Sequence, residues 1–364
     1  MSVVHVGLIG AGVISDTYLK NLKSFPDLRV DMVADLDVAR AEAQASRYGV
    51  PASGSVRELL ERPGIELVVN LTVPGAHVEV GLAALESGKH VWAEKPLALD
   101  RPSARKLLDR AHELGLRVAS APDTVLGAGL QTARRAIEAG RIGEPLTALA
   151  LFQSPGPESW HPAPEFLFRA GGGPLLDMGP YYLTELVHLL GPVRRVTATG
   201  GRARETRVIG SGPRSGTAFA VEVATTVSAL LEFERGGSAQ AMFSFDSALP
   251  RSVFEITGTL GTAVLPDPNR FDGRTVLHLP DRIELAPEGH SASRGTGVLE
   301  MARAIRSGRP ERASGALAFH VLDAMQSIEE SIADGRPVLL QSTVEVPPPL
   351  APDWDPYART LQGP

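Results

Sequence analysis

The feature that most constrains this chain is a regular alternation of apolar runs and helical patterns across its first 121 residues. Two of the helical patterns end at a glycine, which is a common helix stop. Near-continuous apolar strands that alternate with helices are typical of a parallel sheet covered on both faces. The expected strands are Val3–Ile9, Leu28–Ala34, Ile65–Leu71, His90–Ala93 and Leu116–Ala121, and the expected helices are one that carries Ile14 to Leu22, Val38–Tyr48, His77–Ser87 and Arg101–Leu114.

A glycine-rich turn, Gly10-x-Gly12-x-x-Ser15, directly follows the first expected strand and opens a helix. The first glycine permits the tight turn, and the second lets a pyrophosphate approach the backbone at the positive end of the helix. Asp35 follows the second strand, where a carboxylate can hold a ribose diol. The pattern predicts dinucleotide binding. Because Asp35 repels a 2′-phosphate, NAD is favoured over NADP. Arg40 can bind such a phosphate, so NADP stays an alternative.

After residue 124 the pattern changes to strands separated by loops rich in Gly, Pro and Ser. Several of these strands alternate apolar and polar residues, which is typical of a sheet with two unlike faces. The expected strands are Leu146–Gln153, Val193–Arg202, Val221–Phe233, Ser238–Phe245, Val253–Ile256 and Thr275–Leu279, and the expected helices are Gly127–Ala139, one that begins near Asp177, Val298–Ser307 and Ala316–Ala333. We expect a dinucleotide-binding domain over residues 1–124, a second domain over 125–345, and a Pro-rich tail over 346–364 that is extended or partly disordered.

Composition excludes several classes of site. The 364 residues include no Cys, which rules out disulfides, thiolate nucleophiles and Cys-based zinc sites. A formal net charge of −6 argues against a chain-wide basic surface for nucleic acid or an anionic membrane. The N-terminus lacks the pattern of a secretory signal, and no apolar run reaches the length of a membrane span, so we expect a cytoplasmic protein. The common metal-binding motifs are absent, and we expect no metal.

Three segments together resemble the Gfo/Idh/MocA family of NAD(P)-dependent oxidoreductases. They are GLIGAGVIS at 7–15, LTVPGAHVEVGLAALESGKHVWAEKPLA at 71–98 and GGGPLLDMGPYYLTELVHLLGPV at 171–193. The resemblance implies an N-terminal Rossmann parallel sheet (α/β), then an α+β domain with a large, open, mainly antiparallel sheet covered by helices on one face. The uncovered face predicts self-association, as a homodimer or homotetramer. The resemblance also implies sugars, cyclitols or their derivatives as substrates, with hydride transfer at nicotinamide C4.

The segment Glu94-Lys95-Pro96 follows an expected strand, at the edge where open α/β sheets bind ligands. The Lys95 ammonium can hydrogen-bond a nicotinamide ribose and a substrate oxygen, and it can stabilise a developing alkoxide. Only five of the 36 Lys and Arg residues are Lys, so a lysine within a motif is informative. The alternative is a surface lysine at a strand–loop junction. A cis Lys95–Pro96 bond would suit a tight bend here.

The helix near Asp177 places Asp177, Tyr181, Thr184 and His188 on one face. The family pattern has Asp, His and Asp at the first three positions, so this chain departs from it at Tyr181 and Thr184. A tyrosine ordinarily has a pKa near 10 and needs a nearby cation, such as Lys95, to act as an acid or base. Tyr181 is therefore either the proton-transfer group or a packing residue. Asp177 is a site residue, a helix N-cap or both, and His188 is expected to be structural.

The remaining candidates flank these segments. Trp160 and His161 lie in a loop before the glycine run, where Trp160 can stack on a sugar, and Arg169 can bind substrate; each can also lack a role. Asp123 is expected to cap a helix. The expected catalytic residues are Lys95, Asp177 and Tyr181. The expected cofactor-binding residues are Gly10, Ala11, Gly12, Val13, Ile14, Asp35, Leu36, Thr72, Val73, Pro74, His77, Glu94 and Lys95.

The sequence therefore predicts an NAD-dependent oxidoreductase acting on a secondary alcohol or ketone of a sugar, cyclitol or related polyol. Two alternatives remain open at this stage. One is a glycoside-cleaving enzyme that uses transient oxidation and elimination, which regenerates its NAD in each turnover. The other is an NAD(P)-binding sensor without catalytic activity.

Overall fold

The computed structural model describes residues 2–361, and this part of the chain divides into two compact units. Of these residues, the first unit takes 2–127, 289–319 and 350–361, and the second takes 128–288 and 320–349. The chain thus leaves the first unit after Gly127 and returns to it twice. The predicted boundaries had placed 289–319 in the second domain and 350–361 in a separate tail.

The first unit is built on a parallel sheet, as predicted. Its strand order is β3-β2-β1-β4-β5-β6 and all its strand pairs are parallel. The strands are β1 (Val4–Ile9), β2 (Leu28–Ala34), β3 (Ser53–Gly54), β4 (Leu67–Asn70), β5 (His90–Ala93) and β6 (Val118–Ser120). The two-residue strand β3 was not predicted, because it is too short to show a pattern.

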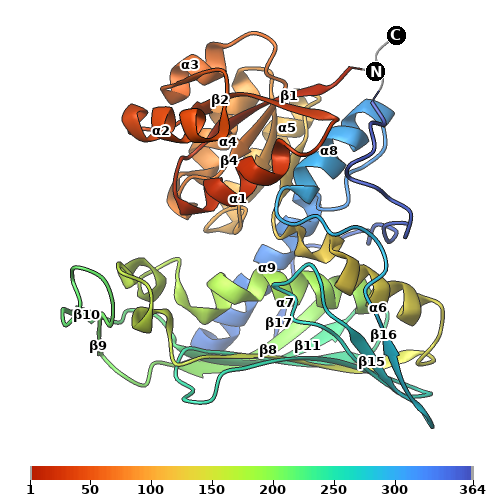
Figure 1. Ribbon diagram of the computed structural model, residues 1–364. Helices are drawn as coiled ribbons and strands as arrows, with labels where there is room; N and C mark the ends of the chain where they lie inside the picture. The colour runs from red at the N-terminus through yellow and green to blue at the C-terminus, as the bar shows by residue number, and fades with distance from the viewer. Residues whose placement is uncertain (1, 362–364) are drawn as a thin grey trace. The chain divides into compact units, whose positions relative to one another are not determined.

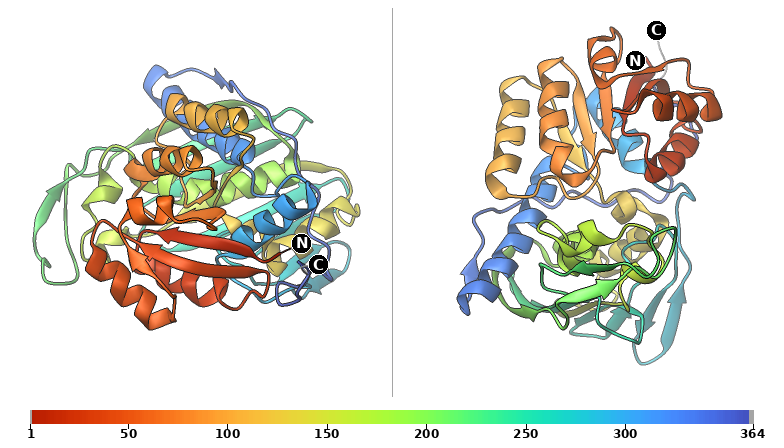
Figure 2. Two further views of the ribbon diagram at one scale, coloured as in Figure 1. Left: turned by 90° about the horizontal axis from the view of Figure 1, so that it is seen from above. Right: turned by 90° about the vertical axis from the view of Figure 1, so that its left-hand side faces the viewer.

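Helices cover both faces of this sheet (Figure 2). They are α1 (Val13–Leu22), α2 (Val38–Tyr48), α3 (Val56–Glu61), α4 (His77–Glu86), α5 (Arg101–Glu113) and α8 (Thr296–Ser307). The helix α8 comes from the first return of the chain and packs against α1 (Figure 1). The short helix α3 was not predicted, although Ser55 and Glu58 form a capping box at its start.

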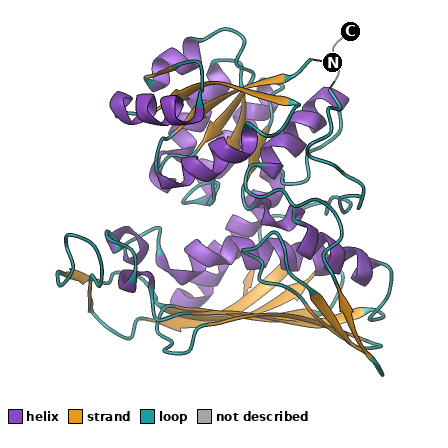
Figure 3. Ribbon diagram, in the orientation of Figure 1, coloured by secondary structure: helices purple, strands orange, loops and turns teal. Residues whose placement is uncertain are grey.

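The second unit contains a nine-stranded sheet of order β16-β15-β14-β13-β7-β12-β11-β8-β17 (Figure 3). Only the β7–β12 pair is parallel among the described strands of this sheet. The strands are β7 (Pro145–Gln153), β8 (Val193–Gly201), β11 (Thr226–Phe233), β12 (Ser238–Ser244), β13 (Arg251–Gly258), β14 (Thr262–Val264), β15 (Thr275–His278), β16 (Arg282–Leu285) and β17 (Val338–Leu339). The predicted mainly antiparallel sheet is confirmed.

Helices cover one face of this sheet and leave the other face open (Figure 3). The helix α7 (Gly173–Leu190) packs on β7, β11 and β12, and α6 (Ala128–Glu138) packs on α7. The helix α9 (Gly315–Asp334) contacts β8, where His320 Nε2 accepts the Val193 N–H and Ser331 Oγ accepts the Ala198 N–H. A small hairpin, β9 (Thr206–Val208) with β10 (Ala218–Ala220), lies in a stretch predicted as loop.

The start of α7 differs from the prediction. The helix begins at Gly173 with Gly172 as its N-cap, so Asp177 lies inside it and is not the cap. Pro174 fits the first turn, where no N–H is needed, while Gly172 is required because a Cβ there would lie 2.6 Å from the Phe166 carbonyl oxygen. Pro180 consequently falls within the helix rather than in its first turn.

The Pro-rich tail lacks helix and strand over residues 350–361 but is firmly held by the first unit. The fully buried Asp27 carboxylate accepts the N–H groups of Thr360 and Leu361 and the Arg303 guanidinium. Arg303 also donates to the carbonyl oxygens of Asp355 and Ala358. The predicted absence of helix and strand is confirmed for these residues, whereas their anchoring by Asp27 was not predicted, because no local pattern shows such a partner.

None of the helices within residues 2–361 has both the length and the apolar character needed to cross a membrane.

Candidate active site

The glycine turn after β1 leaves room at the start of α1. Gly10 has a φ of 104°, and a Cβ there would lie 2.6 Å from the Leu71 carbonyl oxygen, so only glycine fits. Gly12 is the N-cap of α1 and makes no side-chain cap. A Cβ on Gly12 would meet no atom within 4 Å. The first-turn N–H groups of α1 can therefore donate hydrogen bonds to an anionic group, such as the pyrophosphate of a dinucleotide.

Asp35 joins the end of β2 to this turn. Its Oδ2 accepts the Ala11 N–H at 2.7 Å and its Oδ1 accepts the Asp37 N–H at 2.9 Å. Each carboxylate oxygen keeps a second lone pair, so the group can still accept from ribose hydroxyls. The structure thus fixes the carboxylate beside the uncapped start of α1, which is the arrangement that holds a dinucleotide.

A pocket of about 350 Å³ lies against these groups. Arg40 also lines it, and this residue pairs with Asp37 at 3.6 Å. Leu36 is 96% exposed, which leaves an apolar side chain at the rim. Six of the predicted cofactor-binding residues line the pocket, namely Gly10, Gly12, Asp35, Leu36, Thr72 and Val73, and the unpredicted lining residues include Val56, Ala76, Glu79 and Val80. The kinds of groups that face this pocket fit part of an NAD molecule: a glycine turn, a carboxylate and apolar side chains.

Asn70, at the end of β4, shapes the loop that follows. Its Oδ1 accepts the Thr72 N–H at 3.2 Å and the Thr72 hydroxyl at 2.7 Å, and its Nδ2 donates to the His77 carbonyl oxygen at 3.0 Å. Asn70 is fully buried. Sequence analysis did not single it out, although a polar residue at the end of an apolar strand was a usable signal.

His77 connects this loop to the next one. Its Nε2 lies 2.9 Å from the Thr72 carbonyl oxygen and its Nδ1 lies 2.7 Å from the Pro96 carbonyl oxygen. The side chain is 1% exposed. A residue predicted to bind the cofactor thus has its ring between two backbone carbonyl oxygens, and it links the loops that carry Thr72 and Lys95.

The Glu94-Lys95-Pro96 segment forms a turn after β5, and the Lys95–Pro96 bond is cis, as predicted. The Glu94 carboxylate accepts the Lys95 N–H through Oε2 at 3.1 Å and the Tyr18 hydroxyl through Oε1 at 2.7 Å. Tyr18 comes from α1, within the helix that was expected to carry Ile14 to Leu22. Its hydroxyl was not predicted to have a polar partner.

Asp123 lies close in the same unit and is fully buried. Its carboxylate accepts the N–H groups of Gly295 and Gly297 at 2.8 and 3.1 Å, at the start of α8. Burial raises the pKa of Asp123 to about 6. The predicted capping role is confirmed, but the capped helix is one that returns from far along the chain.

In the second unit, α7 carries the predicted polar face. Tyr181 is 5% exposed, and the Thr184 hydroxyl donates to the Pro180 carbonyl oxygen at 2.6 Å. His188 is buried, as expected for a structural residue, and lies 3.9 Å from the unpredicted Glu185. Burial raises the pKa of Glu185 to about 8 and lowers the pKa of His188 well below its usual value. Burial thus favours the uncharged form of both side chains.

The loop before α7 carries three neighbouring aromatic rings. His161 lies with its ring centroid 5.5 Å from that of Trp160 and 5.4 Å from that of Phe166. Trp160 is 68% exposed, so its face is open to a ligand. Arg169 lies 4.0 Å from Glu222 at the surface.

Comparisons with known proteins support one family. Residues 4–121 match the family described as "Oxidoreductase family, NAD-binding Rossmann fold", and residues 130–264 match "GFO/IDH/MocA C-terminal domain". The dTDP-3,4-didehydro-2,6-dideoxy-alpha-D-glucose 3-reductase of Streptomyces antibioticus is 30% identical over 337 residues, which are 90% of this chain and 94% of that protein. The chain belongs to the Gfo/Idh/MocA family.

Two further proteins that are similar to this chain agree with its assignment to the Gfo/Idh/MocA family. The myo-inositol 2-dehydrogenase of Thermotoga maritima is 23% identical over 359 residues, 94% of this chain and 100% of that protein. The structure of a levoglucosan dehydrogenase in complex with NADH and L-sorbose has the same fold, with a TM-score of 0.82, 23% identity and coverage of 94% of this chain and 100% of that one. The first unit is thus an NAD-binding Rossmann domain, and the chain is a member of an oxidoreductase family.

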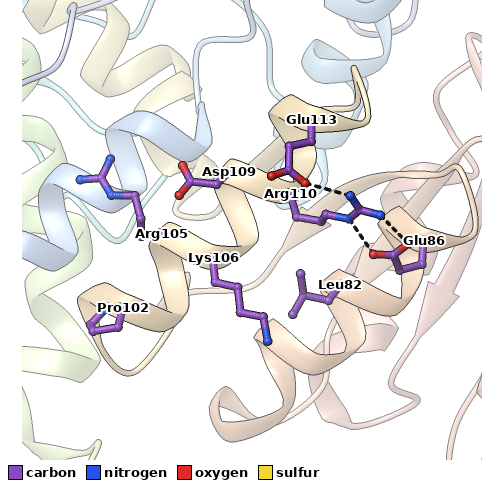
Figure 4. A pocket seen from close by; sticks show the side chains of 8 residues that line it. All are labelled: Leu82, Glu86, Pro102, Arg105, Lys106, Asp109, Arg110 and Glu113. Atoms are coloured by element: carbon purple, nitrogen blue, oxygen red, sulfur yellow. Dashed lines mark hydrogen bonds and ion pairs between the residues drawn. The ribbon is translucent and has the colours of Figure 1, made fainter.

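Two other features of this Gfo/Idh/MocA chain lie apart from the predicted residues. Within residues 2–361 no three His, Asp or Glu side chains are grouped to bind a metal ion. A groove of about 800 Å³ runs between α4 and α5 (Figure 4). There Arg110 pairs with Glu86 and Glu113, and Lys106 extends toward Leu82. None of the predicted site residues lines this groove.

Proposed function

We propose that this protein is an NAD-dependent dehydrogenase or reductase. Its reaction interconverts a secondary alcohol and a ketone of a sugar, cyclitol or related polyol. The observation that carries the proposal is the Asp35 carboxylate, fixed by the Ala11 N–H beside the uncapped start of α1, in a chain of an oxidoreductase family. The named activities of the relatives support the substrate class, since they include an inositol dehydrogenase and a deoxysugar 3-reductase.

We propose NAD rather than NADP as the preferred cofactor. A carboxylate at the position of Asp35 accepts from ribose hydroxyls and repels a 2′-phosphate. Arg40 lines the same pocket but already has Asp37 as a partner.

Lys95, Asp177 and Tyr181 are proposed as the catalytic residues. NAD, when bound, supplies the carbon that receives or gives the hydride. In the oxidation direction the Lys95 ammonium hydrogen-bonds the substrate oxygen and stabilises the negative charge that develops on it. Tyr181 takes up the hydroxyl proton, and Asp177, one helical turn earlier, orients that group. Trp160, His161 and Arg169 are proposed to bind the substrate, with Trp160 stacking on an apolar sugar face.

The test begins with a paired titration of NADH and NADPH, followed by a screen of inositols, anhydrosugars and deoxysugar nucleotides for NAD reduction. The proposal expects NADH to bind more tightly and at least one polyol to reduce NAD with release of the ketone. Substrate cleavage without net NADH, seen by mass analysis, would replace it with a glycoside-cleaving enzyme. Tight NADH binding without turnover of any substrate would replace it with a sensor.

We also propose that the protein self-associates through the open face of the nine-stranded sheet. The centre of this face is a shallow concavity of about 530 Å³ lined by small and apolar residues, including Leu149, Leu151, Leu230 and Met242. Leu149 and Leu230 are 37% and 43% exposed. A second copy of the same face would bury these side chains as a homodimer or homotetramer. Light scattering on Leu230→Arg should then show a smaller particle than the parent chain.

The proposed location is the cytoplasm, where a pool of NAD and NADH is maintained. Fractionation of the source cells tests it: the chain should be found with the cytoplasmic marker enzymes.

A further inference from the structure

A chain of hydrogen bonds leads from the core of the first unit to the backbone of Lys95. The Trp92 indole N–H donates to the Tyr18 hydroxyl oxygen at 3.3 Å, and the Tyr18 hydroxyl donates to Glu94 Oε1 at 2.7 Å. The other carboxylate oxygen of Glu94 accepts the Lys95 N–H at 3.1 Å. The Glu94 carboxylate therefore accepts from both sides, from the Tyr18 hydroxyl and from the Lys95 N–H.

Packing alone does not explain the hydroxyl of Tyr18. The side chain is fully buried within the core of the first unit, where a phenylalanine would fill nearly the same volume. Burial, reinforced by Glu94 and Asp123, raises the pKa of Tyr18 well above its ordinary value. The hydroxyl therefore stays protonated and remains a donor to Glu94 over the working pH range.

The helix α8 packs closely against Trp92: a Cβ on Gly297 would lie 2.0 Å from Trp92 Cη2. Gly295, the N-cap of α8, lies beside Tyr18, where a Cβ would make an ordinary contact at 3.8 Å from Tyr18 Cδ1. Asp123 caps this end of α8 through the N–H groups of both glycines. Trp92, which donates to the Tyr18 hydroxyl oxygen, thus packs against a helix that is itself anchored.

The turn that carries Lys95 is held on both sides. Before it, the Glu94 carboxylate accepts the Lys95 N–H. After it, the Pro96 carbonyl oxygen lies 2.7 Å from His77 Nδ1. The peptide group before Lys95 and the one after Pro96 both have a partner, so the turn that carries Lys95 is held at its two ends.

We propose that Tyr18 is a positioning residue for Lys95 and acts through the Glu94 carboxylate. Its hydroxyl selects one orientation of that carboxylate, and the second oxygen then fixes the backbone at Lys95. The catalytic consequence rests on the proposed function, but the effect on the Lys95 environment does not.

The scarcity of lysine makes the direct test simple. The chain has five lysines, so reductive ¹³C-methylation of the full-length protein gives few signals in a ¹H–¹³C spectrum, and Lys95→Arg assigns the signal of Lys95. Tyr18→Phe should displace and broaden that signal and leave the other four unchanged. The matched control is Tyr48→Phe, which removes another tyrosine hydroxyl donated to a carboxylate, that of Asp16 at 2.8 Å. The control should leave the Lys95 signal in place.

A double-mutant comparison separates positioning from packing. In a Glu94→Ala background, or Glu94→Gln if that variant does not fold, Tyr18→Phe should have little further effect on the Lys95 signal. An equal displacement in both backgrounds means that Tyr18 acts by packing and overturns the proposal. An unmoved Lys95 signal in the single variant overturns it as well.

The activity measurement uses the polyol found in the substrate screen. Tyr18→Phe should lower kcat by about tenfold or more, because small misplacements of a catalytic group are costly, while the Kd for NADH changes less than about twofold. An unchanged kcat overturns the catalytic part of the proposal. If no polyol is oxidised by the parent chain, the proposed function fails, and the Lys95 signal still decides the role of Tyr18.

Discussion

The two units present candidate chemistry in different ways. In the first unit, polar side chains hold backbone groups: Asp35 holds the Ala11 N–H, Asn70 holds the Thr72 N–H, and Glu94 holds the Lys95 N–H. In the second unit, the candidates are side chains on the long helix α7 and in the loop before it. Where a site consists of backbone groups, its activity depends on the side chains that fix the backbone. Where a site consists of side chains, its activity depends on those side chains directly.

Lys95→Ala gives the largest expected effect, because Lys95 is a reacting side chain placed by a held backbone. We expect kcat/KM to fall about 10³-fold, since the charge that develops on the substrate oxygen loses its partner. The Kd for NADH, measured by titration, should change much less. The control is Lys106→Ala in the groove between α4 and α5, which should keep full activity. Near-full turnover by Lys95→Ala would contradict the mechanism.

Tyr181→Phe tests whether a side chain of the second unit takes part directly in the reaction. We expect kcat to fall about 10²-fold because the proton acceptor is lost. Its neighbour on α7 provides the control: the Tyr182 hydroxyl bonds Ser252 Oγ at 2.7 Å, and burial raises the pKa of Tyr182 to about 13. Tyr182→Phe should lower the melting temperature and spare kcat. Equal kcat values for the two variants would remove Tyr181 from the catalytic residues.

Asp35→Ala tests whether a side chain that fixes the backbone of the first unit is needed for cofactor binding. The change removes both the ribose partner and the acceptor that fixes the Ala11 N–H. We expect the Kd for NADH to rise about tenfold, with a smaller change or a gain for NADPH. Calorimetric titration measures both, and Asp109→Ala on the exposed side of α5 is the control. Unchanged NADH binding would show that Asp35 has no part in cofactor recognition.

Asp27→Asn gives the smallest effect and one that depends on pH. Hydrogen bonds from Leu361, Thr360 and Arg303 outweigh burial and lower the pKa of Asp27. A carboxyl group with a lowered folded-state pKa stabilises the protein above its unfolded pKa of about 3.9, and this contribution is lost as the pH falls through the folded value.

At pH 7 we expect Asp27→Asn to lower the free energy of unfolding by about 1 kcal/mol. The difference from the parent chain should shrink at acidic pH. Urea titrations at pH 7 and near pH 3 test this, with Asp109→Asn as the control. A difference that is the same at both pH values would mean that the Asp27 charge contributes nothing to holding the tail.

The parts of the fold that follow from local pattern could be predicted from the sequence. The apolar runs of β1, β2 and β4 and the Gly10 turn are short-range signals, and the structure has them where they were expected. The strands β3, β14 and β17 have two or three residues each, which is too few to show alternation. The start of α7 was misplaced because Asp177 is a good N-cap by type, while the decisive features were Gly172 and Pro174.

The candidate site divides in the same way. Asp35, Lys95 and the glycines carry motif signals. Tyr18 does not, because its partner Glu94 is 76 residues away and its position on α1 fits an ordinary apolar face. The capping of α8 by Asp123 and the anchoring of the tail by Asp27 likewise join residues more than 170 positions apart. Periodicity reports only on neighbours along the chain, so such pairs become visible only in the folded molecule.

The first unit includes segments that come late in the chain, so it is complete only after the second unit has been synthesised. The helix that packs against Trp92 spans 296–307, and the partners of Asp27 lie at 360 and 361. A ribosome therefore makes the β-sheet of the cofactor domain before these supports. A fragment that ends at residue 127 contains every glycine of the turn and Asp35, yet it lacks α8 and the backbone groups that bond to Asp27.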